Sequence, residues 1–385
     1  MKKKIGISTL LAIAIAAFFL ISAVSQFEGS YLIEEEDRSQ GQVKEDSAKI
    51  YDGPYIFWKG NRATVQFVWE GKKQTQVYDV QDSVRIPWRF GDSEKPISIA
   101  VASPMLAPET FSGVTKICAI SDIHGQFDKM TKLLKAIGII DDRFQWNWGN
   151  GHLVVTGDMF DRGAKVTEIL WFIHELEKEA QTKGGRIHYL LGNHDIMVMR
   201  GDIRYVNKKY ESVSKELKIS IRDLYGPETE FGRWLRSKNV IVKINDILFV
   251  HAGVSPEVCK RGYTVQMINE KIRNSIDARD YTIQFDDDLK MLYGYEGPIW
   301  YRGYIMDWQG IPKATEEQVK SILDFYSARA VAVGHTIVEK LTPLHRNRVF
   351  AIETGMSGNS EGEALLWENG LFYRLNALGH RETLE

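Results

Sequence analysis

The sequence is organised around three short polar segments, Ser121-Asp-Ile-His-Gly125, Gly157-Asp-Met-Phe-Asp-Arg-Gly163 and Gly192-Asn-His-Asp195. Each segment follows an apolar, β-branched run that is typical of a buried strand in a parallel sheet. The segments lie 36 residues apart (122 to 158) and then 35 (158 to 193), which is the length of a strand, a crossover helix and the next strand. Because open α/β sheets carry their sites at the carboxyl ends of strands, we expect the three segments to meet at one edge.

The rest of this region also predicts an α/β fold. Apolar residues recur at helical spacing over 127–140 and 166–176, between the predicted strands. Asn245-Asp246 and Asn369-Gly370 each separate two apolar runs and predict hairpin turns. Thr315-Glu-Glu-Gln318 has the spacing of a capping box and predicts the start of a helix.

Two insertions interrupt this pattern. Residues 200–238 are polar and predicted to be helical, so they are candidates for a cap over the site. Residues 254–297 form a less regular segment, which we expect to be a second cap-like insertion.

Composition limits the function classes only broadly. The chain has 385 residues, of which 44% are hydrophobic and 26% are charged, as in ordinary globular proteins. The net charge of −2 implies no general attraction to nucleic acid. The two cysteines, Cys118 and Cys259, do not suggest a small disulfide-stapled fold, so we expect free thiols in preference to a disulfide.

The N-terminus carries a targeting pattern. Met1-Lys-Lys-Lys4 precedes an apolar run from Ile5 to Val24, as in a secretory signal, and cleavage after Ser25 would fit. The run of about 20 residues is also long enough to span a bilayer. We therefore expect export to the periplasm or cell envelope, with residues 1–25 either removed as a signal peptide or kept as a membrane tether through residues 5–24.

A polar linker and a small β module are predicted next. Residues 26–49 are charge-dense and read as a solvated linker. Residues 50–110 hold aromatic and β-branched runs broken by hairpin signals such as Lys59-Gly-Asn61. Since so short a module buries little core alone, we expect it to pack against the catalytic domain, predicted at 111–385.

The polar residues at the predicted strand ends form a set of metal ligands. Oxygen and imidazole donors without a thiolate suit manganese, iron or zinc in a reactive site more than a structural zinc. Six side chains with one shared carboxylate are suited to two divalent metal ions about 3.5–4 Å apart. The set consists of Asp122, His124, Asp158, Asn193, His251 and His335. Asp158 is expected to bridge the ions because it follows the middle strand.

Such a site predicts hydrolysis of phosphate esters. A metal pair lowers the pKa of a bridging water, and the resulting hydroxide can attack phosphorus in line. Arg162 and Arg302 are candidates for neutralising the phosphate oxygens. His194 follows the ligand Asn193, and with Asp161 orienting it, it is the candidate general acid for the leaving oxygen.

Each motif alone has a simpler interpretation. A single histidine is more often a hydrogen-bonded core residue, and the polar segments could be ordinary turns. Their joint occurrence after successive strands favours the metal site.

The segments resemble the signature of the calcineurin-like metallophosphoesterases, and within them the phosphoprotein phosphatase branch. The chain is most similar to the Shewanella-like protein phosphatases, over about residues 116–384. The further supporting stretches are Asp122-Ile-His-Gly-Gln126, Gly201-Asp-Ile-Arg-Tyr-Val206, Trp234-Leu-Arg-Ser-Lys-Asn239 and Trp300-Tyr-Arg-Gly-Tyr304. Two residues depart from the pattern: Ser121 stands where the broad family often has Gly, and Asp195 where this branch usually has Glu.

The resemblance implies a β-sandwich flanked by helices, with a dinuclear site at one edge. It implies that Asp122, His124 and Asp158 hold one metal ion. It assigns the second ion to Asp158, Asn193, His251 and His335. It also gives the phosphate to Arg162 and Arg302 and the leaving group to His194.

The implied activity is a phosphatase that hydrolyses phosphomonoesters on phosphoproteins, including phosphotyrosine, or on small phosphate esters. Trp300, Tyr301 and Tyr304 are candidates for receiving an aryl ring. The alternative is a phosphoesterase that acts on nucleotides, diesters or diphosphates with the same site. A non-catalytic binding module is disfavoured because every metal position holds a usable ligand.

Overall fold

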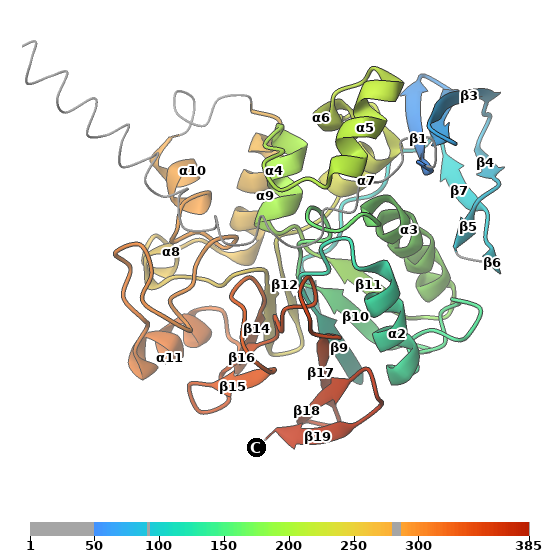
Figure 1. Cartoon of the computed structure of the whole chain (residues 1–385). Helices are drawn as coiled ribbons and strands as arrows, with labels where there is room; N and C mark the ends of the chain where they lie inside the picture. The colour runs from blue at the N-terminus through green and yellow to red at the C-terminus, as the bar shows by residue number, and fades with distance from the viewer. Residues whose placement is uncertain (1–49, 91–92, 279–285, 385) are drawn as a thin grey trace, which may run out of the picture. The chain divides into compact units, whose positions relative to one another are not determined.

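A computed structural model describes residues 50–90, 93–278 and 286–384 of the chain (Figure 1). The predicted signal or anchor at 1–25 and the predicted linker at 26–49 lie outside these ranges. Within them, no helix combines the length and the hydrophobicity that crossing a bilayer requires.

The three polar segments follow three neighbouring parallel strands, as predicted. The strand β10 lies in the middle and pairs with β9 on one side and β11 on the other. The helices α2 and α3 make the crossovers, and α3 continues past the predicted end at Leu176. The bounds are β9 (Lys116–Ile120), α2 (Phe127–Ile137), β10 (His152–Val155), α3 (Val166–Thr182) and β11 (Arg186–Tyr189).

The same sheet continues with antiparallel strands from the end of the chain. The order is β11-β10-β9-β17-β18-β19. The added strands are β17 (Glu363–Glu368), β18 (Leu371–Asn376) and β19 (Arg381–Leu384).

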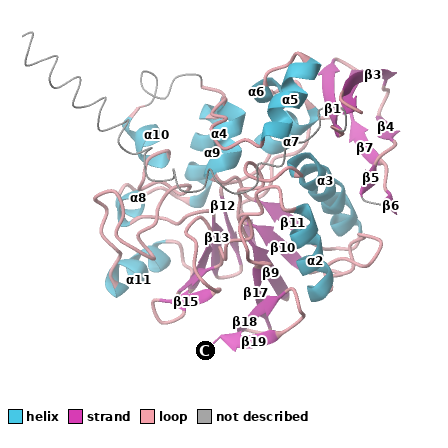
Figure 2. Ribbon diagram, viewed as in Figure 1, coloured by secondary structure: helices cyan, strands magenta, loops and turns pink. Residues whose placement is uncertain are grey.

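A second sheet packs against the first. Its order is β15-β16-β14-β13-β12-β8, with the bounds β8 (Thr110–Phe111), β12 (Ile241–Ile244), β13 (Ile247–Val250), β14 (Ala330–Val333), β15 (Thr342–Leu344) and β16 (Val349–Ala351). In β9, Ala119 joins an apolar cluster with Phe249 of this second sheet, whereas Cys118 and Ile120 join the cluster that contains α2 and α3. The alternation follows from the two-residue period of a strand. The predicted α/β sandwich flanked by helices is therefore confirmed (Figure 2).

The predicted hairpin turns and the predicted capping box are also present. Asn245 and Asn369 each join two antiparallel strands and adopt positive φ values of 55° and 53°, which these hairpin turns require. Thr315 and Gln318 form both bonds of the capping box at the start of α11 (Glu316–Phe325). Cys118 and Cys259 are free thiols.

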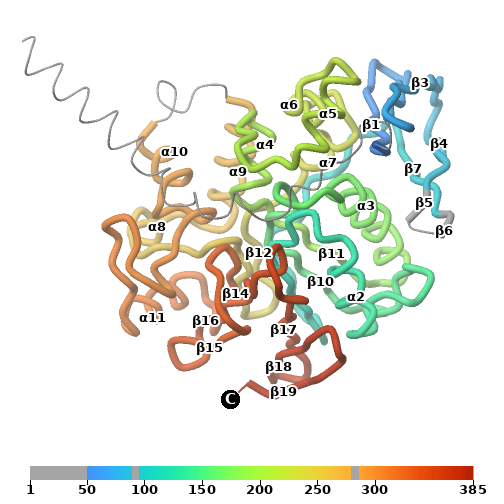
Figure 3. The backbone as a smooth tube through the Cα atoms, viewed as in Figure 1, coloured from blue at the N-terminus to red at the C-terminus, as the bar shows by residue number. Residues whose placement is uncertain are grey.

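Helices fill both insertions. The first insertion holds three helices, as predicted, namely α5 (Lys208–Leu217), α6 (Ile221–Leu224) and α7 (Glu230–Arg236). They follow α4 (Asn193–Arg200), the helix that begins with Asn193. The segment at 254–297, predicted to be less regular, is more helical than expected in its described residues. It forms α8 (Pro256–Lys260), α9 (Val265–Ser275) and α10 (Asp287–Leu292), as the path of the chain shows (Figure 3). Each begins at a side-chain cap, namely Ser255, Thr264 and Asp286.

The N-terminal module is built of antiparallel strands. Strands β1 (Asp52–Lys59), β2 (Arg62–Trp69) and β3 (Lys72–Asp79) form one sheet, and four short strands follow, namely β4 (Ser83–Ile86), β5 (Arg89–Phe90), β6 (Ser93–Glu94) and β7 (Ile97–Ala100). Trp58 of β1 donates its backbone N–H to Glu228 at 2.8 Å, and its indole N–H to Glu230 of α7 at 2.7 Å. Strand β1 therefore lies against the helices of the first insertion (Figure 1).

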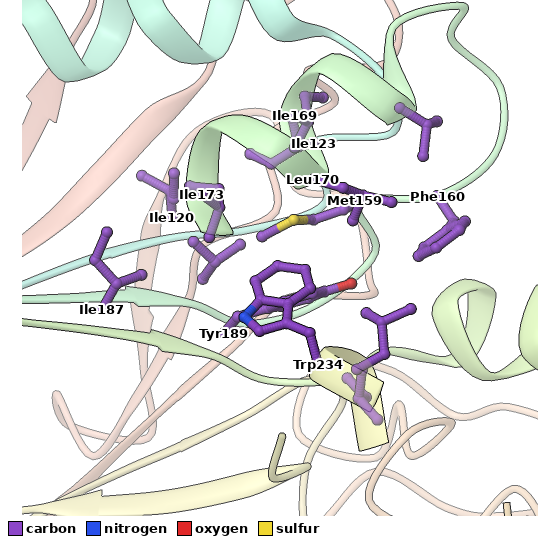
Figure 4. Close-up of a cluster of buried hydrophobic side chains, with 14 of the residues drawn as sticks. Ile120, Ile123, Met159, Phe160, Ile169, Leu170, Ile173, Ile187, Tyr189 and Trp234 are labelled. Atoms are coloured by element: carbon purple, nitrogen blue, oxygen red, sulfur yellow. The ribbon is translucent and has the colours of Figure 1, made fainter. Parts of the chain in front are cut away.

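A buried cluster supports the loops that follow β9 and β10. Ile123, Met159 and Phe160 lie between the polar residues of these loops and pack with apolar side chains of α3 (Figure 4). Each such burial contributes roughly 1.5–3 kcal/mol. The apolar members anchor the loops in the core, which leaves the polar members at the edge of the sheet.

Candidate active site

Strand ends from both sheets meet at the site. Asp122, Asp158 and Asn193 follow the three parallel strands, while His251 follows β13 and His335 follows β14. The loops are joined by backbone hydrogen bonds: His124 N–H donates to Asp158 O at 2.9 Å, and Gly334 N–H donates to His251 O at 2.7 Å.

The donor atoms form two groups that share one carboxylate. His124, Asp158 and His194 offer ligand atoms within 4.8 Å of one another, and so do Asp158, His251 and His335. Asp158 belongs to both groups, which is the arrangement that a bridging ligand needs. Asn193 Oδ1 lies 2.8 Å from His251 Nε2, inside the second group.

Asp122 lies beside the second group. Its Oδ2 accepts the His335 backbone N–H at 3.0 Å and also bonds the Ser121 hydroxyl. Among the described residues it is in neither group of three, and the first group holds His194 instead. The assignment of Asp122 to the first metal ion therefore remains a prediction. The assignment of His194 to the leaving group, and not to a metal ion, also remains a prediction.

The histidines are oriented as metal ligands are. His124 Nδ1 lies 2.7 Å from Phe160 O, and His251 Nδ1 lies 2.8 Å from Thr156 O. Each Nδ1–H therefore donates to a carbonyl, which leaves Nε2 to face the site. His335 Nε2 is buried and has no hydrogen-bond partner within the described residues. Such a buried nitrogen is costly unless a ligand satisfies it, so the donor set fits divalent cations.

Charges inside the site favour the same conclusion. Burial lowers the pKa of His335, and Arg302 lowers it further, so this imidazole stays neutral. Burial also lowers the pKa of His251, but Asp158 and Asp122 raise it more, to about 9. A proton on His251 thus offsets the crowded carboxylates, and a bound cation would replace that proton.

Strained backbone is concentrated in these loops. Asp122, His124, Asp158, Asp161 and His335 have φ values of 49°, 46°, 56°, 71° and 63°. A residue with a Cβ atom pays about 1–3 kcal/mol for such a conformation, which persists only where surrounding contacts hold it. Three of these residues, His124, Asp158 and His335, supply ligand atoms of the two donor groups.

Asp195 supplies part of that restraint, and the sequence analysis noted it only as a departure from the family pattern. Its carboxylate is fully buried and accepts backbone N–H groups of Asp158, Met159 and Gly192 at 2.9, 3.0 and 2.7 Å. It therefore fixes the loop that carries Asp158. Its place in the first turn of α4 is the signal that could have revealed this role.

His194 and Asp161 form a buried pair. His194 Nδ1 lies 2.6 Å from Asp161 Oδ2. Burial lowers the pKa of His194, but Asp158 and Asp161 raise it more, so it stands above its ordinary value. The protonated imidazole directs Nε2–H away from Asp161, as a general acid requires.

The two arginines lie at the edge of the site, half-buried. Arg162 Nη1 donates to Ser357 Oγ at 3.1 Å, and Arg302 Nη1 donates to His335 O at 3.2 Å. The Ser357 contact was missed, because only the fold brings that loop to Arg162.

The three aromatic candidates for receiving an aryl ring differ in their surroundings. Tyr301 and Tyr304 are each only 1% exposed and pack against each other in the core. Trp300 is half-buried, and its ring centroid lies 5.4 Å from that of His335, so it alone of the three borders the ligands.

Glu353 is a further buried carboxylate that the sequence analysis did not single out. It follows β16 and accepts the Gly355 N–H at 2.7 Å. Burial raises its pKa well above the ordinary value, and the nearby charge of Asp122 raises it further. Its position after a strand was the available signal.

Comparison with known proteins decides the family. The model of the calcineurin-like phosphoesterases matches residues 115–339. The chain belongs to this family. An uncharacterised Schizosaccharomyces pombe protein is 32% identical over 267 residues, which cover 65% of this phosphoesterase and 75% of the relative. Shewanella-like protein phosphatase 1 of Plasmodium berghei is 30% identical over 250 residues, covering 63% and 67%.

A solved structure extends the similarity to nearly the whole described chain. The phosphoesterase is similar to a cold-active protein-tyrosine phosphatase of a psychrophilic Shewanella species, with a TM-score of 0.80 and 36% identity. The match covers 87% of this chain and 99% of that one. These findings confirm the predicted resemblance, and they confirm that the phosphoesterase is an enzyme, a metal-dependent phosphatase.

Some more distant relatives are named for another activity. A symmetrical bis(5'-nucleosyl)-tetraphosphatase of Pasteurella multocida is 22% identical over 298 residues, covering 67% of this phosphoesterase and 96% of the relative.

Proposed function

We propose that this phosphatase hydrolyses phosphomonoesters on proteins, with phosphotyrosine as the favoured substrate, at a site holding two divalent ions of manganese, iron or zinc. The observation that carries the site is the position of Asp158, which two groups of donors share. The relatives named as protein phosphatases support a protein substrate, and the tyrosine phosphatase structure that matches 87% of the chain supports the tyrosine ester.

The residues divide the work by chemistry. The donor residues around Asp158 would hold two divalent cations, which would supply Lewis-acid activation of water and neutralisation of phosphate charge. Arg162 and Arg302 bind the remaining phosphate oxygens, because guanidinium groups match the geometry of an oxyanion. His194 gives its Nε2 proton to the leaving oxygen, and Asp161 holds the ring in that orientation through Nδ1.

Phosphotyrosine also suits the surroundings of the site. The Trp300 ring borders His335, and the Tyr205 ring centroid lies 5.1 Å from that of His194. An aromatic ring beside each of the two donor groups favours an aryl leaving group, since ring pairs contribute about 0.5–1.5 kcal/mol beyond burial.

A rate survey tests this proposal. We expect the highest kcat/KM on a phosphotyrosine peptide, a lower value on the matching phosphoserine peptide, and little turnover of a cyclic nucleotide or a dinucleoside polyphosphate. A preference for the dinucleoside polyphosphate would instead support the alternative function, to which the Pasteurella relative points.

We also propose that the protein is exported to the periplasm or cell envelope. The support is the sequence of residues 1–25, with lysines before an apolar run. Fractionation of cells and N-terminal sequencing of the recovered protein test it. An intact N-terminus in the cytoplasmic fraction would contradict export.

A further inference from the structure

A buried carboxylate of the N-terminal module faces the catalytic domain. Asp52 begins β1 and is 5% exposed. It lies outside residues 115–339, where the family model matches. Its Oδ2 accepts hydrogen bonds from the Tyr55 hydroxyl and, at 3.3 Å, from Thr167 Oγ1 of α3.

The partner of this carboxylate is Lys209 of α5. Lys209 Nζ lies 2.8 Å from Asp52 Oδ1, and both side chains are buried. Glu168 lies near the same ammonium group, at 3.5 Å. Burial lowers the pKa of Lys209, but the charges of Asp52 and Glu168 raise it more, so the ammonium stays charged. Removing one member of such a pair leaves an uncompensated buried charge.

Lys209 also reaches the catalytic loop. Its Nζ donates to the backbone carbonyl of Ala164 at 2.8 Å. Ala164 ends the segment that carries Asp161 and Arg162. The Tyr210 hydroxyl donates to the same carbonyl at 3.0 Å.

The rest of this loop depends on the same stretch of chain. Arg162 N–H donates to Tyr205 O at 2.9 Å, and Arg162 O accepts from Asn207 Nδ2 at 2.9 Å. Arg162 has a φ of 61°, a strained conformation that needs such support. Residues 205–210 therefore support the loop that carries Asp161 and Arg162. Asp52 in turn fixes Lys209, which belongs to residues 205–210.

We propose that Asp52, acting through Lys209, is a positioning residue that fixes the loop carrying Asp161 and Arg162. The proposal rests on the phosphatase function proposed above and gives the N-terminal module a part in it. A displacement of about 1 Å at such a loop can cost on the order of a hundredfold in rate, so the module acts on catalysis without touching substrate.

Asp52→Asn and Lys209→Met test the proposal in the full chain. With p-nitrophenyl phosphate as substrate, we expect KM to rise and kcat/KM to fall by about tenfold or more. The inhibition constant of inorganic phosphate should rise with KM, because Arg162 binds that anion. Metal content should stay at the wild-type level. Lys209→Arg, which keeps the charge and the donors, should recover most of the loss.

Glu230→Gln is the matched control. Glu230 is also buried and bonds Trp58 of the same strand, and its ion pairs within the described residues go to His174 and Arg233, outside the loop of Asp161 and Arg162. This variant should lower Tm and leave KM and phosphate inhibition unchanged. If Lys209→Met fails to fold, Tyr210→Phe removes the other donor to Ala164 O and supplies the same readout.

Two results would contradict the inference, the first by removing the positioning role alone and the second by removing the proposed function. If Asp52→Asn lowers Tm but keeps the wild-type KM and phosphate inhibition, the contact serves stability alone and the proposal is wrong. If the wild-type protein with its metals hydrolyses no phosphate ester, the proposed function itself fails, and the positioning role falls with it.

Discussion

His194 Nδ1 lies 2.6 Å from Asp161 Oδ2, with both side chains buried beside the shared ligand Asp158. In the proposed mechanism, this contact fixes which nitrogen of His194 faces the substrate. The proposed mechanism thereby assigns the proton to His194 and the cations to the other donor residues. The first prediction follows from this division of roles.

His194→Ala should lose rate according to the leaving group. We expect a loss of about 10²–10⁴-fold with an alkyl phosphate, whose leaving oxygen needs a proton, and a much smaller loss with p-nitrophenyl phosphate. The measurement is kcat/KM across esters of graded leaving-group pKa, with metal content as the control. Equal losses on all esters, accompanied by loss of metal, would mean that His194 serves as a ligand, as its grouping with His124 and Asp158 allows.

Asp195→Ala should weaken metal binding although Asp195 faces no ligand position. Four backbone N–H groups, those of Asp158, Met159, Phe160 and Gly192, would lose their acceptor. Groups that orient metal ligands typically contribute 10–100-fold in affinity. Metal titration of the apoprotein measures this effect. Asp195→Glu, the residue usual in the resembling branch, should retain most of the affinity, and an unchanged affinity in the alanine variant would refute the restraint.

Stability should fall in mild acid because of a histidine pair far from the site. His188 Nε2 lies 2.9 Å from His152 Nδ1. Burial, and then Arg186, lower the pKa of His152 to about 4. The unfolded chain therefore binds more protons between about pH 6.5 and 4, so the free energy of unfolding decreases as the pH falls through that window.

The effect of His152 should amount to about 1–2 kcal/mol after screening by solvent. Urea unfolding at pH 7 and pH 4.5 measures it. His152→Gln should show a smaller decrease than the wild-type protein. An equal decrease in both would assign the acid sensitivity to other groups.

The sequence predicted features that local chemistry determines. The spacing of Asp122, Asp158 and Asn193 reflects the length of a strand–helix unit, and parallel strands carry such residues to one edge. Asn245 and Asn369 mark hairpins because few other residues accept positive φ. Two of the helices at 254–297 were missed because they are short, α8 with 5 residues and α10 with 6. The longer α9 was missed because the cap at Thr264 and the spacing of Ile268 and Ile272 were not weighed.

Contacts between segments distant in the sequence could not be predicted from local sequence patterns. The ion pair of Asp52 with Lys209 joins two segments whose separate patterns only indicate a strand and a helix. The same holds for the Ser357 contact of Arg162. In both cases the local sequence is compatible with many contact partners, and the packing of the whole chain determines which partner is present.

Metal content tests the central claim most directly. The account predicts two divalent ions per chain in the active wild-type protein, measured by elemental analysis after exhaustive dialysis. Asp158→Asn should lose at least one ion together with activity, because both donor groups share that carboxylate. Full activity without bound metal, or two ions retained in Asp158→Asn, would contradict it.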